Sequence, residues 1–228
     1  VIGGNANDSF VGGNGNDTLA GHGGNDRLEG GTGLNELIGS TGNDIYVVTN
    51  RTDSTVEYAG EGLDTVETTI GIYALQANVE NLTFTDHATH GAGVGNMLDN
   101  VINGGDGIDD LYGRAGNDTL NGWGSANTLL GQEGDDVYFV VTAGDSVIEF
   151  AGQGNDTVRT TLSAFVLRDN VENLIYAEEL DYFSPGAFTG IGADNANSIT
   201  GGSFDDFLSG LGGDDILFSK SGADILLG

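Results

Sequence analysis

A large apolar residue recurs every nine positions in three stretches of the chain, separated by glycine, asparagine and aspartate. In the first stretch these apolar positions are Phe10, Leu19, Leu28, Leu37 and Tyr46. Nine residues are too few for a helix-based repeat, and each internal glycine costs a helix about 1 kcal/mol. The pattern instead predicts half a turn of a coil, in which a glycine-rich turn precedes a short strand with one inward-facing apolar side chain.

Two such repeats close one turn of 18 residues, so the Asp or Asn two positions before each apolar residue lies above its counterpart two repeats away. Parallel strands stack about 4.8 Å apart. Carboxylates at that spacing repel by about 1 kcal/mol in bulk water and by about 3 to 4 kcal/mol at an effective dielectric near 20. A cation is therefore expected between the turns. Calcium–oxygen distances of about 2.3 to 2.6 Å are half the spacing, whereas magnesium, at about 2.0 to 2.1 Å, fits less well.

The nine-residue blocks alternate with two longer spacers that match each other at a constant offset of 92 residues. We expect blocks at residues 1–47, 95–139 and 192–228, the last truncated, and spacers that continue the coil at 48–94 and 140–191. The second spacer has a five-residue insertion within 176–190, which predicts a surface loop. The NVENL motif in each spacer is expected to pack under the linker rather than to act as a recognition element. Because the chain begins at Val1 and stops inside a repeat at Gly228, we expect a segment of a longer protein.

Charge limits the possible partners. The chain has 35 acidic and 6 basic residues, a formal net charge of −29. Such a surface repels nucleic acids and anionic lipids, and no apolar run approaches the ~20 residues of a membrane helix. With no cysteine, disulfides and thiolate metal sites are excluded. The GxSxG and HExxH motifs are absent and the HATH segment at His87 and His90 lacks a third ligand, so we expect neither a catalytic site nor a zinc site.

The repeats GGNGNDTLA, GRAGNDTLN and GLGGDDILF resemble the RTX nonapeptide, the hemolysin-type calcium-binding repeat of secreted bacterial proteins. Isolated copies are better explained by metal-free Asx turns, but an array in phase favours metal. The resemblance implies an all-β fold, a right-handed parallel β-roll or β-solenoid. It also implies Ca²⁺ ions, on the order of ten, bound between adjacent turns by carboxylates and loop carbonyls.

The resemblance also implies the ligands. At the sixth position of the repeats, including two degenerate ones, they are Asp8, Asp17, Asp26, Asp44, Asp64, Asp109, Asp118, Asp136, Asp156, Asp206, Asp215 and Asp224, with Asn35 and Asn127 as weaker substitutes. In the loops they are Gly12, Asn14, Asn16, Gly21, Gly23, Gly30, Thr32, Gly104, Asp106, Gly113, Ala115, Asn117, Gly131 and Glu133. Four further acidic residues could be ligands or solvated strand ends: Asp53, Glu57, Asp145 and Glu149.

Three functions follow as expectations. The first is a structural and secretion module of a type I-secreted protein that folds on binding Ca²⁺ outside the cell, since low hydrophobicity and high charge keep the ion-free chain disordered. The second is a calcium-rigidified segment of a surface-layer or adhesin assembly, with neighbouring repeats or copies as partners. The third is an accessory module of a secreted enzyme, such as an alginate epimerase, protease or lipase, whose catalytic domain lies outside this chain.

Overall fold

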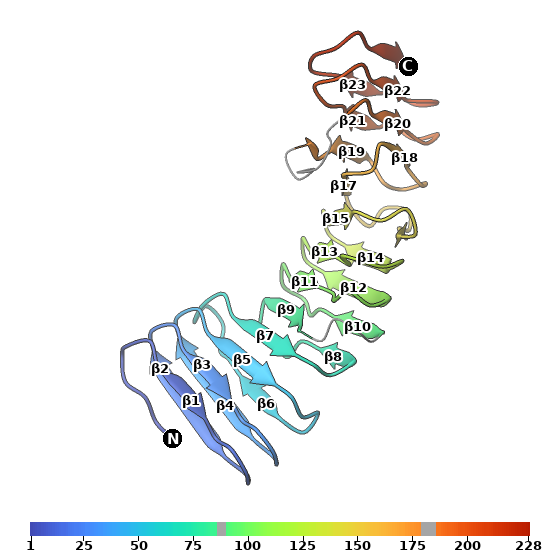
Figure 1. The fold of residues 1–228 in the computed structure, drawn as a ribbon. Helices are drawn as coiled ribbons and strands as arrows, with labels where there is room; N and C mark the ends of the chain where they lie inside the picture. Colours follow the sequence, from blue (N-terminus) through green and yellow to red (C-terminus); the bar gives the residue numbers. More distant parts are fainter. Residues whose placement is uncertain (86–89, 179–185) are drawn as a thin grey trace.

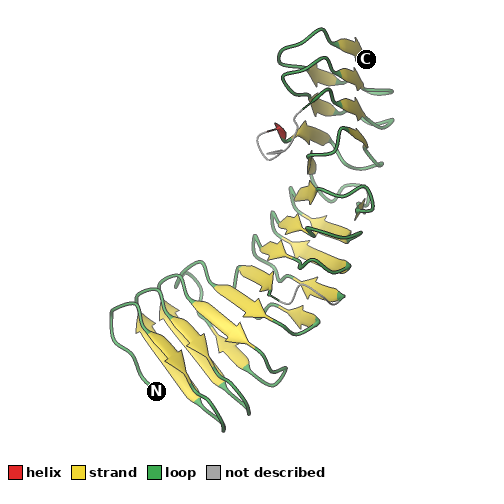
Figure 2. Ribbon diagram, viewed as in Figure 1, coloured by secondary structure: helices red, strands yellow, loops and turns green. Residues whose placement is uncertain are grey.

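The structure is a computed structural model of the 228-residue chain and describes residues 1–85, 90–178 and 186–228. Within these ranges there is no α-helix, and only Glu178 is in 3₁₀ conformation. The chain winds as a coil of short parallel strands joined by turns (Figures 1 and 2). The expected all-β solenoid is confirmed. No helix among the described residues is long and apolar enough to cross a membrane.

One 12-stranded sheet runs the whole length of the coil. Its strands, in spatial order, are β1 (Ser9–Val11), β3 (Arg27–Glu29), β5 (Ile45–Val48), β7 (Thr65–Thr68), β9 (Asn81–Phe84), β11 (Val101–Asn103), β13 (Thr119–Asn121), β15 (Val137–Val140), β17 (Thr157–Thr160), β19 (Asn173–Tyr176), β21 (Ser198–Thr200) and β23 (Ile216–Phe218). Consecutive strands of this sheet are separated in sequence by one strand of the opposite face, as a coil requires (Figure 1).

The opposite face consists of three shorter sheets. The first contains β2 (Thr18–Gly23), β4 (Glu36–Thr41) and β6 (Ser54–Val56). The second contains β8 (Ile72–Ala74), β10 (Gly91–Val94), β12 (Asp109–Ala115), β14 (Thr128–Glu133) and β16 (Ser146–Val147). The third contains β18 (Ala164–Val166), β20 (Thr189–Ile191), β22 (Phe207–Ser209) and β24 (Ile225–Leu227).

The strand register gives the length of each turn. β1 pairs with β3 so that Ser9 lies opposite Arg27, a turn of 18 residues. In the first spacer the turn lengthens to 20 residues between Asp44 and Asp64 and shortens to 16 between Asp64 and Glu80. The long sheet therefore passes through the spacers without a break, and the two unequal turns keep the strands in phase.

The core is a column of apolar side chains contributed by most of the half-turns. The residues that the nine-residue period points inward, among them Leu19, Leu28, Leu37, Leu111 and Leu120, are completely buried. Each buried leucine contributes about 1.5 to 3 kcal/mol relative to an exposed one. Among the described residues this column is the one apolar cluster, so the polar side chains that lie between the turns need hydrogen bonds or ions to stabilise them.

Parts of both spacers pack into the core. Val79 and Leu82 of the first NVENL motif are fully buried, which agrees with a packing role for the motif. Near the two ends of the 176–190 segment, the rings of Tyr176 and Phe188 are each 1% exposed and stack 4.8 Å apart, so the loop expected for the five-residue insertion would have to lie between them. The apolar area that these two aromatic rings bury stabilises the core at this point. Residues 179–185 of that insertion, and His87 of the HATH segment, lie outside the described residues.

Candidate metal centre

The sixth-position carboxylates form ladders along the coil. Oδ1 of Asp26 accepts a hydrogen bond of 2.8 Å from the backbone N–H of Asp8, one turn away. Oδ1 of Asp44 accepts one of 2.7 Å from the N–H of Asp26. The same bond joins Asp17 to Asn35, Asp44 to Asp64, Asp109 to Asn127, Asp118 to Asp136, Asp136 to Asp156, Asn197 to Asp215 and Asp206 to Asp224. The coil therefore brings all of the predicted sixth-position residues into vertical stacks.

The second oxygen of many of these carboxylates has no partner. It is buried and accepts no hydrogen bond in Asp17, Asp26, Asp44, Asp53, Asp118, Asp136 and Asp215. Burial raises the pKa of Asp118 and of Asp136 to about 7, and the neighbouring acids add to this rise. An unsatisfied buried polar atom costs about 1 to 3 kcal/mol, and more when it is charged. A cation with oxygen-ligand preference, such as Ca²⁺, would relieve both the unpaired oxygens and the repulsion.

At two of the turns where asparagine stands in place of aspartate, its amide donates a hydrogen bond to the next carboxylate of the ladder. Asn35 Nδ2 donates a hydrogen bond of 2.9 Å to Asp53 Oδ1, and Asn127 Nδ2 donates one of 3.0 Å to Asp145 Oδ1. An amide donor thus offsets part of the negative charge at these turns. Asp53 and Asp145, whose roles the sequence left open, are rungs of the ladder rather than solvated strand ends.

Glycines at the first position of the loops make room for the carboxylates. A Cβ on Gly21 or Gly113 would overlap Oδ2 of Asp26 or Asp118, five residues later. The other predicted first-position residues have the same environment, each beside the sixth-position side chain of its own loop: Gly12, Gly30, Gly104 and Gly131. At the fourth position, Gly42 has a φ of +131° and lies directly against the carbonyl of Gly24 on the next turn. These glycines permit the turns to stack closely.

The predicted ligands at the third and fifth positions lie on the outer edge of the loops. The carbonyl of Thr32 accepts a hydrogen bond of 3.0 Å from Gly15, and that of Glu133 one of 3.0 Å from Gly116. At the fifth position, Oδ1 of Asn16 accepts a hydrogen bond of 3.0 Å from the backbone N–H of Leu34. Oδ1 of Asn117 accepts one of 2.8 Å from the backbone N–H of Asp135. The other third-position residues occupy the same edge: Asn14, Gly23, Asp106 and Ala115. This edge holds adjacent turns together.

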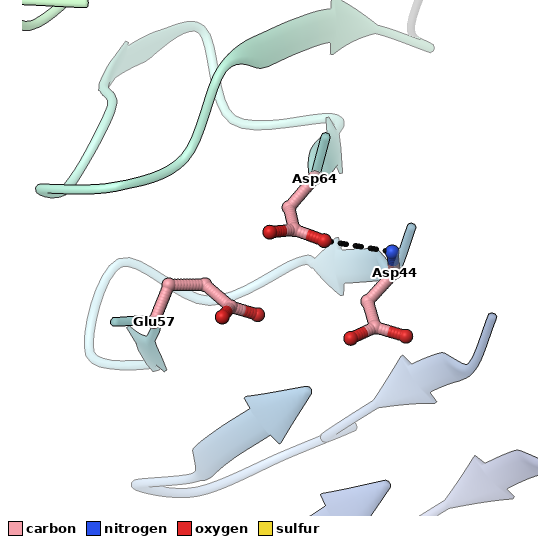
Figure 3. Close-up of side chains that lie close together, drawn as sticks. All are labelled: Asp44, Glu57 and Asp64. Carbon is pink, nitrogen blue, oxygen red and sulfur yellow. Dashed lines mark hydrogen bonds between the residues drawn. The ribbon is translucent and has the colours of Figure 1, made fainter. Parts of the chain in front are cut away.

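Two compact carboxylate clusters stand out among the described residues. Asp44, Glu57 and Asp64 are all buried, and one carboxylate oxygen of each lies within 4.8 Å of the others (Figure 3). Asp136, Glu149 and Asp156 repeat the arrangement in the second spacer. Burial, more than the neighbouring acids, raises the pKa of Glu57 to about 8 and that of Asp64 to about 7. These clusters concentrate more negative charge than any single rung of the ladder.

A ladder residue that the sequence analysis missed is the glutamate of the NVENL motif. Glu80 Oε2 accepts a hydrogen bond of 2.8 Å from the N–H of Asp64, and Glu172 Oε2 accepts one of 2.9 Å from that of Asp156. The turn that ends at each glutamate has 16 residues rather than 18, and the longer side chain takes the place of the aspartate. The recurrence of NVENL at the same offset was the signal in the sequence.

Comparison with known proteins identifies the repeats. The family described as "RTX calcium-binding nonapeptide repeat (4 copies)" matches residues 2–37, 95–138 and 191–226, just over half of the chain. The chain belongs to this family. RTX repeats bind calcium, and the matched ranges contain the glycine-rich loops whose carboxylates form the ladders.

Two glycanases of Rhizobium meliloti (strain 1021) are similar to parts of this RTX chain. Endo-1,3-1,4-beta-glycanase ExsH is 43% identical over 65 residues, which are 28% of this chain and 14% of the glycanase. Endo-1,3-1,4-beta-glycanase EglC is 33% identical over 95 residues, 40% of this chain and 18% of the glycanase. The aligned regions thus cover less than a fifth of either relative.

Proposed function

We propose that this chain is a calcium-dependent structural module that folds outside the cell and accompanies a type I-secreted protein. The observation that carries the proposal is the ladder of buried carboxylates in which one oxygen is bonded between turns and the other has no partner. A net charge of −29 makes such a coil costly without counter-ions. RTX repeats are typical of secreted bacterial proteins, which fits calcium supplied from outside.

In this proposal the ladder residues bind the ions, and the apolar core column forms as a consequence of that binding. The unpartnered Oδ2 atoms of residues such as Asp26, Asp44, Asp118 and Asp136 would contact Ca²⁺, and loop carbonyls would complete its oxygen ligands. Because these groups are dispersed in the unfolded chain, the free energy of binding becomes free energy of folding. The chain would cross the secretion channel unfolded at low cytosolic calcium and fold in external calcium, with on the order of ten ions bound.

A calcium titration tests this proposal. Far-UV circular dichroism should show a cooperative change from coil to β structure on adding Ca²⁺, with much less effect of Mg²⁺, and native mass spectrometry should count several bound ions. A chain that is fully folded in chelator would overturn the proposal, because its carboxylate ladder would then be stable without a cation.

The similarity to two endo-1,3-1,4-beta-glycanases favours a second, compatible role as the accessory module of a secreted glycanase. Catalysis would then reside in a domain outside this chain. The coding sequence on either side of the segment tests this: a glycoside-hydrolase domain in the same reading frame supports it, and a flanking region made only of adhesin or surface-layer repeats contradicts it. In the first case the full-length protein should release sugars from mixed-linkage β-glucan.

A further inference from the structure

The spacers replace a loop glycine by glutamate at one particular place. β6 pairs with β4 so that Ile38 lies opposite Val56, and the next pair in this register is Gly39 with Glu57. Glu57 therefore occupies the position that is glycine at the start of the preceding loops of the same stack, Gly21 and Gly39. In the preceding loops a side chain at this position would overlap the sixth-position carboxylate. The position therefore faces the interior of the loop stack.

The side chain of Glu57 lies in the space left by Gly39. A Cβ on Gly39 would overlap Oδ2 of Asp44 and the hydroxyl of Tyr46, and would lie 2.6 Å from Oε1 of Glu57. Glu57 is only 7% exposed and Asp44 only 1%. Oε2 of Glu57 and Oδ2 of Asp44 are both buried without a hydrogen-bond partner. The close-up shows the carboxylate of Glu57 directed toward the space between Asp44 and Asp64 (Figure 3).

Tyr46 fixes the orientation of this carboxylate. It replaces the leucine found at the same position of the preceding repeats, and its hydroxyl accepts a hydrogen bond of 2.8 Å from the N–H of Gly39. The same hydroxyl donates to Oε1 of Glu57. Because one oxygen of Glu57 is thus engaged, the other remains directed into the cluster with two aspartates, as an ordered ligand would be.

The second spacer reproduces every part of the arrangement. Glu149 is 8% exposed, and its Oε2 and Oδ2 of Asp136 are buried without a partner. Tyr138 accepts a hydrogen bond of 2.9 Å from Gly131 and donates one to Oε1 of Glu149. The substitutions of Gly by Glu and of Leu by Tyr therefore occur together, at both junctions and on the same stack of loops.

We propose that the Ca²⁺-type cation at each junction between a repeat block and a spacer is held by three carboxylates, those of Asp44, Glu57 and Asp64 at the first junction and of Asp136, Glu149 and Asp156 at the second. The proposal rests on the calcium-binding function proposed above and adds a third carboxylate, from the following turn, to what is elsewhere a pair. One oxygen of each carboxylate in the first cluster already accepts a hydrogen bond, so the other oxygens would contact the ion and loop carbonyls would complete its shell. Each site closes the last regular turn before the coil changes to turns of 20 and 16 residues.

The test is the number of ions bound by a Glu57→Gln/Glu149→Gln double variant. Glutamine keeps an oxygen to accept the tyrosine hydrogen bond but removes the charge, so each cluster is reduced to a pair of carboxylates and two of the sites, one for each cluster, should fill only at higher calcium concentrations than in the parent chain. Native mass spectrometry over a calcium titration gives the ion count at each concentration. Circular dichroism checks that the variant is folded.

Glu61→Gln is the matched control. Glu61 lies in the same loop, its carboxylate accepts a hydrogen bond from the N–H of Tyr58, and the second spacer naturally has Gln153 at the corresponding place. This control removes one negative charge beside the first cluster, as Glu57→Gln alone does, and should leave the ion count unchanged. An unchanged count in the double variant would overturn the junction sites while leaving calcium-dependent folding intact. A parent chain that folds without calcium would instead refute the underlying function.

If the Glu57→Gln/Glu149→Gln variant does not fold, a second measurement tests the position of the ions. Tb³⁺ bound at the junctions would be excited through the adjacent phenols, so Tyr46→Phe/Tyr138→Phe, made together with Trp123→Phe to remove the indole, should lose most of the tyrosine-sensitised emission. This variant retains all six carboxylates of the two clusters and should bind as many calcium ions as the parent. Undiminished emission relative to Trp123→Phe alone would contradict the proposed position of the ions.

Discussion

The hydroxyl of Tyr46 in one turn of the coil donates a hydrogen bond to the carboxylate of Glu57 in the next. Tyr138 and Glu149 form the same pair in the second spacer. Both tyrosine rings are fully buried in the core column. In each spacer one side chain therefore connects the apolar interior of the solenoid with the acidic edge where the carboxylates stack, which would couple the proposed ion binding to packing at these two turns.

Replacing Tyr46 by phenylalanine should separate the two contributions. The ring still fills the core, but Glu57 and the N–H of Gly39 lose their partner, which should cost about 1 to 3 kcal/mol of unfolding free energy. Urea unfolding at saturating calcium measures this loss. Tyr58→Phe is the control, since Tyr58 is 67% exposed and should change stability by less than about 0.5 kcal/mol. Equal effects of the two substitutions would contradict the structural role of the Tyr46 hydroxyl.

Because Leu120 belongs to the core column, we expect Leu120→Ala to lower the free energy of unfolding strongly. Leu120 is completely buried between the turns of β11 and β15, so truncation should leave a cavity and cost about 2 to 5 kcal/mol. Leu34→Ala removes the same atoms from a side chain that is 57% exposed and should cost much less. Chemical unfolding of both variants in calcium provides the comparison. A small effect at Leu120 would mean that the column does not carry the stability of the coil.

Gly131→Ala tests the space reserved for the carboxylates. The new methyl group would overlap Oδ2 of Asp136 and the hydroxyl of Tyr138, so we expect a cost of about 1 to 3 kcal/mol and a higher calcium concentration at the folding midpoint. Gly4→Ala, where the methyl group meets nothing within 4 Å, should leave the midpoint unchanged. If the two variants fold at the same calcium concentration, the first-position glycine is not needed for the site.

Acid should substitute in part for calcium. Burial raises the pKa of Asp118 and Asp136 from 3.8 to about 7 and that of Glu57 and Glu149 from 4.5 to about 8 in the ion-free fold. Since the folded chain then holds protons that the unfolded chain has released, its stability is greatest below the unfolded pKa values and falls as pH rises through the folded ones. In chelator, the β signal in circular dichroism should increase as pH is lowered from about 8 to about 5. A calcium-saturated sample should vary less, and an ion-free signal independent of pH would argue against buried carboxylates.

The second position of the loops imposes a left-handed backbone even on residues other than glycine. Arg114 has a φ of 89°, close to the 93° of Gly13 and the 81° of Gly31 at the same position. A residue other than glycine loses about 1 to 2 kcal/mol of folding free energy through strain in this conformation. Glycine avoids the strain but lowers stability by about 0.4 to 1 kcal/mol, because its unfolded chain has more conformational freedom to lose. Arg114→Gly should therefore stabilise the folded chain slightly, by up to about 1 kcal/mol. Arg114→Ala removes the same charge without relieving the strain, and a thermal melt that ranks alanine above glycine would contradict this account.

Much of the fold could be predicted from the sequence, because in a solenoid every contact is between residues a fixed distance apart. The nine-residue recurrence of Leu19, Leu28 and Leu37 identified the inward side chains, and the 18-residue turn placed Asp26 over Asp8. The same period gave the sixth-position ladder and the glycines beside it. Sequence and structure agree in these blocks because local spacing determines spatial neighbours there.

The spacers required the tertiary structure, because their turns have 20 and 16 residues and the spacing no longer shows which residues meet. The recurrence of NVENL marked Glu80 as a repeated position, but only the structure showed that it replaces an aspartate of the ladder. The stacking of Tyr176 on Phe188, near the ends of the 176–190 segment, also appeared only in the structure. Glu57 could equally have been a solvated strand end until the register placed it over Gly39, against Asp44 and Tyr46. The sequence by itself determined the coil, its core and the acidic ladder through a regular period. Only the tertiary structure determined where a third carboxylate lies beside two stacked aspartates, because in irregular turns the sequence spacing does not show which residues are in contact.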